Sequence, residues 1–193
     1  MDDTTLIKKL KQGDEQAFRE VVNLYEGMVI NTCYGFVHQY EEAEDIAQDV
    51  FVQVYKSIGK FRSDAKLSTW IYRISVNQSL NYLRKKNKRS IIERAEDYLF
   101  DYGIETVAES ANNQPQAILE NKERAQQLHS AIDSLPENQK IAFTLSKYRG
   151  ESNKKIAEIM KISVSAVEAL LNRAKTKLRI KLLDYYKNSL KIK

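Results

Sequence analysis

Glycine and proline are so scarce in this chain that long helices are the structures open to it. The 193 residues include six Gly and two Pro. Turn-rich β architectures need many such residues, because glycine and proline are the usual breakers of regular structure. Apolar residues recur every three to four positions over long stretches, as in amphipathic helices. We therefore predict an all-α fold.

The helical periodicity falls into two groups with a polar tract between them. The first group has four predicted helices, over residues 4–12, 15–40, 41–58 and 67–88, with Asp14 placed to cap the second. Periodicity is lost from residue 89 onward, and the tract without periodicity includes the polar sequence ESANNQPQ. It returns as four further helices. We predict two small helical domains, residues 1–90 and 117–193, joined by a flexible linker over residues 91–116.

Several functional classes find no support in the residues. The chain has one cysteine, Cys33, and two histidines, His38 and His129, without the spacing of a zinc site. We predict that Cys33 is a core thiol, that there is no metal or cofactor, and that there is no catalytic residue. The N-terminus lacks a signal peptide and no apolar run is long enough to span a membrane, so we expect a cytoplasmic protein outside the membrane.

Charge alternates along the chain in four blocks. Residues 1–65 hold 7 Lys and Arg against 12 Asp and Glu, whereas residues 66–94 hold 8 against 1. Residues 95–153 hold 5 against 10, and residues 154–193 hold 11 against 3. Two separate basic blocks suggest two DNA contacts, and the acidic blocks suggest protein partners. Chance patchiness in a helical protein is the alternative.

The sequence SNKKIAEIMKISVSAVEALLNRAKTKLRIK from Ser152 has the layout of a helix-turn-helix. Ala157 provides the small residue at the helix crossing, and Lys161 stands where many such turns carry a left-handed glycine, at a cost of about 1 kcal/mol. The apolar contacts between the helices are assigned to Ile156, Met160, Ile162, Val167 and Leu170. One side of the second helix is apolar and carries Val164, Val167, Leu170, Leu171, Ala174 and Leu178. An ordinary helical hairpin with a basic end is the alternative interpretation.

The opposite face of the second helix carries residues that suit DNA. Small and hydrogen-bonding side chains near its start can approach base edges, and Asn172 and Arg173 can pair with adenine and guanine. The basic residues that follow suit phosphates.

Two earlier helices also carry unusual faces. In residues 41–58 the outer face is acidic but has Val52 at its centre, which resembles an apolar anchor within a polar rim. In residues 67–88 one line of side chains joins an aromatic ring to Arg and Asn, as stacking on bases and pairing with phosphates require. That line is Trp70, Arg73, Asn77, Asn81 and Arg84. Trp70 is equally compatible with a place in the core.

Three segments, taken in their order along the chain, resemble the extracytoplasmic-function sigma factors of bacterial RNA polymerase. They are AEDIAQDVF, KFRSDAKLSTWIYRISVNQSLNYLR and the segment from LPENQK to the helix-turn-helix. The resemblance spans residues 14–183. It implies an alternative sigma factor that binds core polymerase and directs promoter recognition, melting and transcription initiation. The implied partners are the clamp coiled coil and flap of core RNA polymerase, promoter DNA and an anti-sigma factor.

The resemblance also implies roles for particular residues. The polymerase contact would be made by Glu41, Asp45, Gln48, Asp49 and Val52. The minus 10 element would be bound by Phe61, Arg62, Ser63, Lys66, Trp70, Arg73, Asn77, Asn81, Arg84 and Lys85. The minus 35 element would be bound by Ser163, Ser165, Ala166, Ala169, Asn172, Arg173 and Lys177. Lys154, Lys155, Lys161 and Glu168 depart from the family pattern, so its minus 35 preference is not carried over.

Two other functions are compatible with parts of the chain. An autonomous helix-turn-helix regulator would bind duplex DNA without polymerase, but has no use for the second basic block with its aromatic line. An enzyme acting on nucleic acid would need a carboxylate cluster near a basic groove. The acids lie mainly on the predicted outer face of residues 41–58, away from such a groove.

Overall fold

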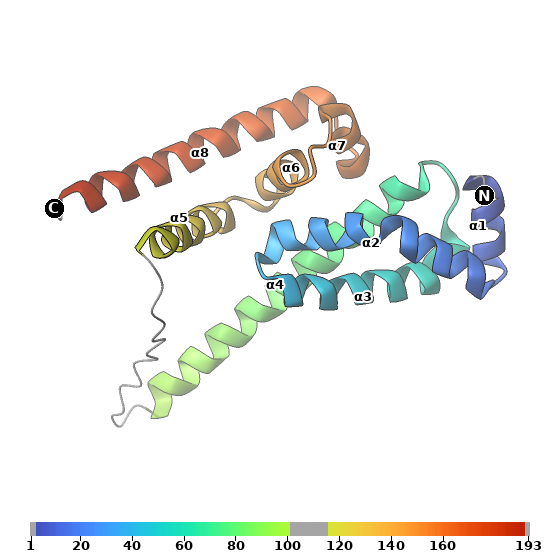
Figure 1. The fold of residues 1–193 in the computed structure, drawn as a ribbon, viewed down its shortest axis with the longest axis horizontal. Helices are drawn as coiled ribbons and strands as arrows, with labels where there is room; N and C mark the ends of the chain where they lie inside the picture. Colours follow the sequence, from blue (N-terminus) through green and yellow to red (C-terminus); the bar gives the residue numbers. More distant parts are fainter. Residues whose placement is uncertain (1–2, 101–115, 192–193) are drawn as a thin grey trace.

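The computed structural model describes residues 3–100 and 116–191, and the described part of the chain is helical throughout (Figure 1). The N-terminal domain is formed by α1 (Asp3–Lys11), α2 (Glu15–Val37), α3 (Tyr40–Ser57), the short 3₁₀ helix η1 (Ile58–Lys60) and α4 (Leu67–Phe100). The C-terminal domain is formed by α5 (Gln116–Asp133), α6 (Glu137–Lys147), α7 (Asn153–Met160) and α8 (Val164–Lys191). The predicted all-α fold with two helical domains is confirmed.

In the N-terminal domain, α2, α3 and α4 pack on one another, and α1 lies against α2 and η1. Asp14 caps α2 as predicted, because its Oδ1 accepts a hydrogen bond of 3.0 Å from the amide of Ala17. The α2 helix ends earlier than predicted, where His38 adopts a left-handed conformation with φ of 61°. Cys33 is fully buried in the core, as expected.

The fourth helix is longer than the periodicity indicates. It was expected to end near residue 88, but α4 continues to Phe100. Residues 89–100 contain no glycine or proline, so nothing in them breaks a helix even though they lack an apolar stripe. Of the expected linker, residues 91–100 therefore belong to α4, Gln116 begins α5, and residues 101–115 lie outside the described residues.

The C-terminal domain has the four helices that the sequence predicts. Ser152 caps α7 by accepting a hydrogen bond of 3.2 Å from the amide of Lys155. The α7 helix ends at Lys161, which is left-handed with φ of 57° and ψ of 44°. The α8 helix then starts at Val164, so the expected helix-turn-helix is present.

The left-handed Lys161 leads to a stability prediction. A Cβ atom is unfavourable in this conformation, so Lys161→Gly should raise the free energy of unfolding by about 1 kcal/mol. Urea unfolding followed by circular dichroism measures the change. Lys175→Gly at an exposed position inside α8 is the control and should lower the free energy of unfolding by about 1 kcal/mol. Equal destabilisation by both substitutions would contradict the assigned strain.

The two domains pack against each other along a seam in which α6 contacts α2 and α7 contacts α4 (Figure 1). Buried residues of both domains belong to one hydrophobic cluster, which includes Phe36 and Ile71 from the first domain and Leu145 and Ile156 from the second. At Gly35 the α2 backbone comes so close that Thr144 Oγ1 donates a hydrogen bond of 3.3 Å to its carbonyl oxygen. The described structure is therefore a closed arrangement of the two domains.

Candidate functional site

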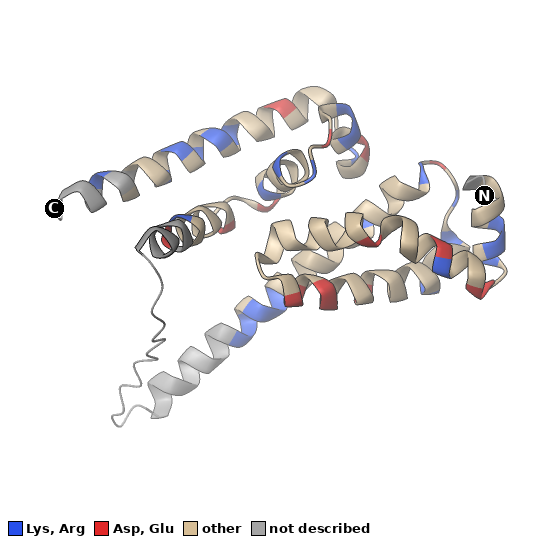
Figure 2. Cartoon of the chain, in the orientation of Figure 1, with Lys and Arg blue, Asp and Glu red and all other residues tan. Residues whose placement is uncertain are grey.

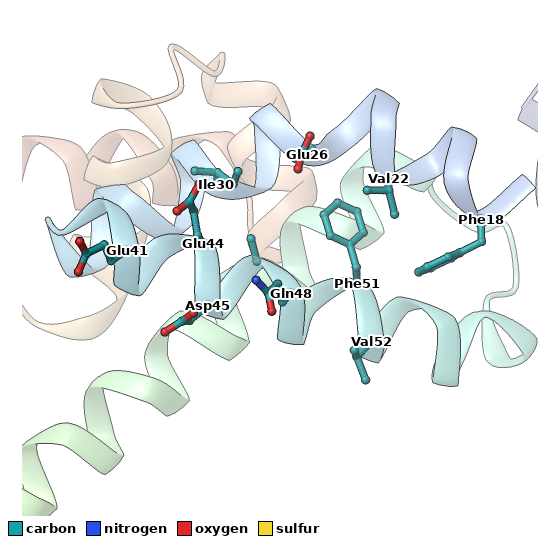
Figure 3. A pocket seen from close by; sticks show the side chains of 11 residues that line it. Phe18, Val22, Glu26, Ile30, Glu41, Glu44, Asp45, Gln48, Phe51 and Val52 are labelled. Atoms are coloured by element: carbon teal, nitrogen blue, oxygen red, sulfur yellow. The ribbon is translucent and has the colours of Figure 1, made fainter. Parts of the chain in front are cut away.

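A groove of about 620 Å³ lies between α2 and α3 (Figure 3). Four of the five residues expected to contact polymerase line it, namely Glu41, Asp45, Gln48 and Val52. Asp49 is exposed on α3 but does not line the groove. Val52 is 48% exposed although it is apolar, which agrees with the expected anchor within a polar rim.

The far wall of the groove was not predicted. It comes mainly from α2 and combines apolar and acidic side chains, which are Phe18, Val22, Glu26 and Ile30, with Glu44, Ala47 and Phe51 added from α3. Phe18 and Val22 follow the helical periodicity of α2 in a way that is typical of core residues. Both are only partly buried. The sequence signal that could have indicated this wall is the apolar periodicity of residues 15–40 together with the outward Val52 on the next helix.

The expected minus 10 residues separate into buried and exposed sets. Phe61 is 3% exposed and packs against Trp70, with ring centroids 5.1 Å apart. Phe61 thus packs in the core of this structure, because the loop after η1 folds its ring inward, and its contact with DNA stays a prediction. Trp70 is partly buried at the edge of that core. The remaining exposed or partly exposed members are Arg62, Ser63, Lys66, Arg73, Asn77, Asn81, Arg84 and Lys85.

Two arginines of this set are engaged by the C-terminal domain. Arg73 donates to the backbone oxygens of Glu158 at 2.8 Å and Ile159 at 3.1 Å, at the carboxyl end of α7. The negative end of the helix dipole favours a cation there. Arg84 forms a 2.7 Å ion pair with Glu137 at the start of α6. The closed arrangement therefore uses side chains that the sequence assigns to DNA.

Other contacts of the seam lie beside Arg73. The Tyr72 hydroxyl donates to Glu151 and accepts from Arg149 Nε at 3.3 Å. Burial, together with the hydrogen bond to Glu151, raises the pKa of Tyr72 to about 12, so it remains a neutral donor. Lys155 Nζ donates to the hydroxyl of Thr69. These contacts were not predicted, because they join residues that are far apart in the chain.

The expected minus 35 residues lie together at the start of α8. Ser163, Ser165, Asn172, Arg173 and Lys177 are exposed, and Ala166 and Ala169 are partly exposed. Ser163 also caps α8, because its Oγ accepts a hydrogen bond of 3.2 Å from the amide of Ala166. The surface is therefore small and polar near the helix start and basic further along, as base-edge and phosphate contacts require.

Two apolar assignments in the helix-turn-helix are wrong. Ile162 is 37% exposed and Val164 is 41% exposed, so neither fills the space between the helices. Ile162 lies in the turn, and Val164 is the first residue of α8. Both therefore precede the part of the helix in which the helical spacing brings side chains onto the inner face. Ile156, Ala157, Val167, Leu171, Ala174 and Leu178 are buried as expected.

The charge pattern of the sequence becomes a spatial one (Figure 2). Acidic residues are prominent at the start of α3, and basic residues lie along α8 and where α4 leaves the N-terminal domain. Among the residues that the structure describes, no group of acidic, cysteine or histidine side chains is arranged to hold a metal ion. In the same described part, no helix is long and apolar enough to cross a membrane.

A helical protein with a helix-turn-helix, a second basic helix and an acidic groove belongs to the class of DNA-binding transcription proteins with a protein partner. Residues 21–89 match the family Sigma-70 region 2, and residues 125–178 match Sigma-70, region 4. The RNA polymerase sigma-H factor of Pseudomonas aeruginosa is 30% identical over 178 residues, covering 90% of each chain. The sigma factor SigW of Bacillus subtilis is 30% identical over 188 residues, covering 92% of this chain and 95% of that protein.

Solved structures show the same fold. CnrH, in complex with the cytosolic domain of CnrY, matches with a TM-score of 0.61 and 23% identity, covering 95% of this chain and 97% of CnrH. The sigma factor RpoE of Bartonella quintana, in complex with the anti-sigma factor NepR, matches with a TM-score of 0.56 and 18% identity, covering 86% of this chain and 96% of RpoE. The chain belongs to the extracytoplasmic-function (ECF) family of RNA polymerase sigma factors. It is an alternative sigma factor, a class that binds core RNA polymerase and promoter DNA.

Proposed function

We propose that this sigma factor binds core polymerase through the groove between α2 and α3, reads the minus 10 element with the exposed face of α4, and reads the minus 35 element with the start of α8. The observation that carries the proposal is the groove, whose apolar floor is bordered by acidic side chains on both helices. We assign residues 1–90 to polymerase binding and minus 10 recognition, residues 117–193 to minus 35 recognition, and residues 91–116 to the connection.

The chemistry of the groove selects its occupant. Phe18, Val22 and Phe51 offer apolar surface, while Glu26, Glu41 and Asp45 border it with negative charge. An amphipathic helix with basic flanks matches both features, because apolar anchors give affinity and complementary charge orients the encounter. We assign this role to the clamp coiled coil of the largest polymerase subunit. The polymerisation chemistry then belongs to the polymerase, and this chain contributes binding and orientation.

Promoter binding requires the two domains to separate. The minus 35 and minus 10 elements lie about 25 base pairs apart, which at ~3.4 Å per base pair is about 85 Å. Domains packed on each other cannot span that distance. Separation also frees Arg73 from the end of α7 and Arg84 from Glu137. Tethering both domains to one polymerase then converts two weak, salt-sensitive DNA contacts into one selective interaction.

We further propose that an anti-sigma protein keeps this chain from polymerase. The two structural neighbours described above are each bound to a partner protein, and NepR is named as an anti-sigma factor. In this chain the anti-sigma protein would bind the groove between α2 and α3, which is accessible. The expected DNA-binding face of α4 is less accessible, because the seam already covers Arg73. A partner in the groove would exclude polymerase directly.

The first experiment is run-off transcription with bacterial core polymerase and fragmented genomic DNA, with and without this protein. New discrete transcripts that depend on the protein are expected. Polymerase that is neither bound nor redirected, together with unaided binding of duplex DNA by the chain, would instead establish an autonomous regulator.

Charge reversal on α3 tests the proposed polymerase contact. Asp45→Lys/Asp49→Lys should weaken binding to core polymerase at least tenfold, about 1.4 kcal/mol, because a basic partner meets two repelling charges. Fluorescence anisotropy of labelled protein titrated with core polymerase measures the change. The matched control is Glu15→Lys/Glu123→Lys, which reverses two exposed acids outside the groove. Equal weakening by both pairs would reduce the effect to net charge and reject the assigned contact.

A further inference from the structure

The chain has two histidines, and they stack on each other across the seam between the domains. The ring centroids of His38 and His129 are 4.0 Å apart, and the ring planes differ by 2°. His38 forms the left-handed end of α2, and His129 lies on α5. The stack therefore joins the N-terminal domain to the C-terminal domain.

The stack is poorly supplied with groups that could balance added charge. The side chain of His38 is 7% exposed, and neither of its nitrogens has a hydrogen-bond partner. Asp133 Oδ1 lies 3.6 Å from His38 Nε2, but the same oxygen accepts a 2.9 Å bond from Lys140 Nζ. One carboxylate therefore faces one lysine and two imidazoles.

The other elements around the stack add little negative charge. Tyr148, which caps the end of α6, lies beside His38 with ring centroids 6.0 Å apart, and Tyr34 of α2 packs against Tyr148. From α4, Lys86 brings a positive charge that Glu42 of α3 pairs at 2.6 Å. No further anion is placed against the rings by the contacts of the described residues.

We propose that the stack of His38 and His129 forms a proton-sensitive latch that holds the two domains together while His129 is neutral and releases them when His129 is protonated. Two flat neutral rings stack favourably. An imidazolium at His129 would have to stay stacked at 4.0 Å on the His38 ring, and the single nearby carboxylate is already paired with Lys140 and offers it little compensation.

The direction of the pH dependence follows from His129. Burial, and then the nearby His38, lower the pKa of His129 in the closed chain below its ordinary value. A proton therefore binds more readily to the open chain, where the ring is in water. The latch contributes fully to closure above the ordinary pKa of about 6.5, and its contribution is lost as the pH falls below that value.

Small-angle X-ray scattering of the full chain at pH 7.5 and pH 5.5 tests the latch. If the closed chain excludes one proton, the ratio of closed to open molecules should fall by up to about tenfold between these values. The radius of gyration and the maximum dimension should both increase. Circular dichroism at each pH verifies that the helices remain intact.

His129→Phe separates the latch from other acid effects. Phenylalanine keeps a flat ring for stacking but cannot take a proton, so the variant should remain closed at both pH values. If this ring does not fit, His129→Gln serves the same purpose. Wild-type dimensions that do not change with pH would overturn the proposal, as would wild-type pH dependence in the variant.

Nuclear magnetic resonance of the two imidazoles gives an independent measure. The pKa of His129 should be below 6.5 in the wild type and return toward 6.5 in a chain whose seam is forced open. An ordinary pKa for His129 in the closed chain would reject the latch. The latch affects transcription only if opening precedes promoter binding, as proposed above. Absence of transcription at every pH would reject that function, whereas the scattering experiment tests the latch alone.

Discussion

Gly35→Ala should separate the two domains while making the helix in which it lies intrinsically more stable. A Cβ atom at this position would lie 2.5 Å from Cγ2 of Thr144, on α6, and 3.1 Å from Cγ of Tyr148, the residue that caps the end of α6. Thr144 is fully buried, and its hydroxyl is held by the Gly35 carbonyl, so rotating it away sacrifices a hydrogen bond. Alanine otherwise favours a helix interior over glycine by about 1 kcal/mol.

Scattering at pH 7.5 measures the separation as an increase in maximum dimension. Gly27→Ala is a matched control, because it makes the same exchange on the same helix and its Cβ would meet nothing within 4 Å. The control should remain closed and become slightly more stable. A Gly35→Ala chain as closed as the control would show that α6 can move away from α2 without losing the seam.

Phe36→Ala should cause a large loss of stability, about 3–5 kcal/mol in the free energy of unfolding. Phe36 is fully buried, and its cluster includes residues of both domains. Its removal leaves a cavity that rigid neighbours on several helices cannot readily fill.

Chemical denaturation followed by helical circular dichroism measures this loss. Leu24→Ala removes a large apolar side chain from the same helix at a position that is 60% exposed, and its effect should be within about 0.5 kcal/mol. Similar losses for both variants would mean that intrinsic helix propensity, rather than burial, dominates the effect at Phe36.

Local signals predicted the helices and two exposed faces well. The Asp14 cap, the left-handed Lys161 and the outward Val52 each depend on a few neighbouring residues, and each appears as expected. Assignments failed where a side chain sits at an element boundary. Periodicity places Ile162 and Val164 on an apolar face, but the turn directs both toward solvent. Phe61 shows the reverse, since a loop residue reaches the core.

The seam could not be predicted, because it joins residues with no local relationship. Gly35 has no unusual φ. A side chain is excluded at this position because it would collide with Thr144 on another helix. His38 and His129 are unremarkable singly and acquire a relationship only when α2 meets α5. The α2 wall of the groove was missed for the same reason, because Phe18 and Val22 follow the periodicity of core residues.

If Arg73 contacts promoter DNA as we propose, its bonds to the end of α7 make the C-terminal domain an intramolecular competitor for that DNA. The apparent dissociation constant for DNA is the intrinsic constant divided by the open fraction, so a chain closed 99% of the time would bind about a hundredfold more weakly. Molecules of this sigma factor that are not bound to polymerase would then leave promoters vacant. Polymerase, by retaining the open form, would restore the intrinsic affinity and ensure that a promoter is occupied by the assembled enzyme and not by its specificity subunit alone.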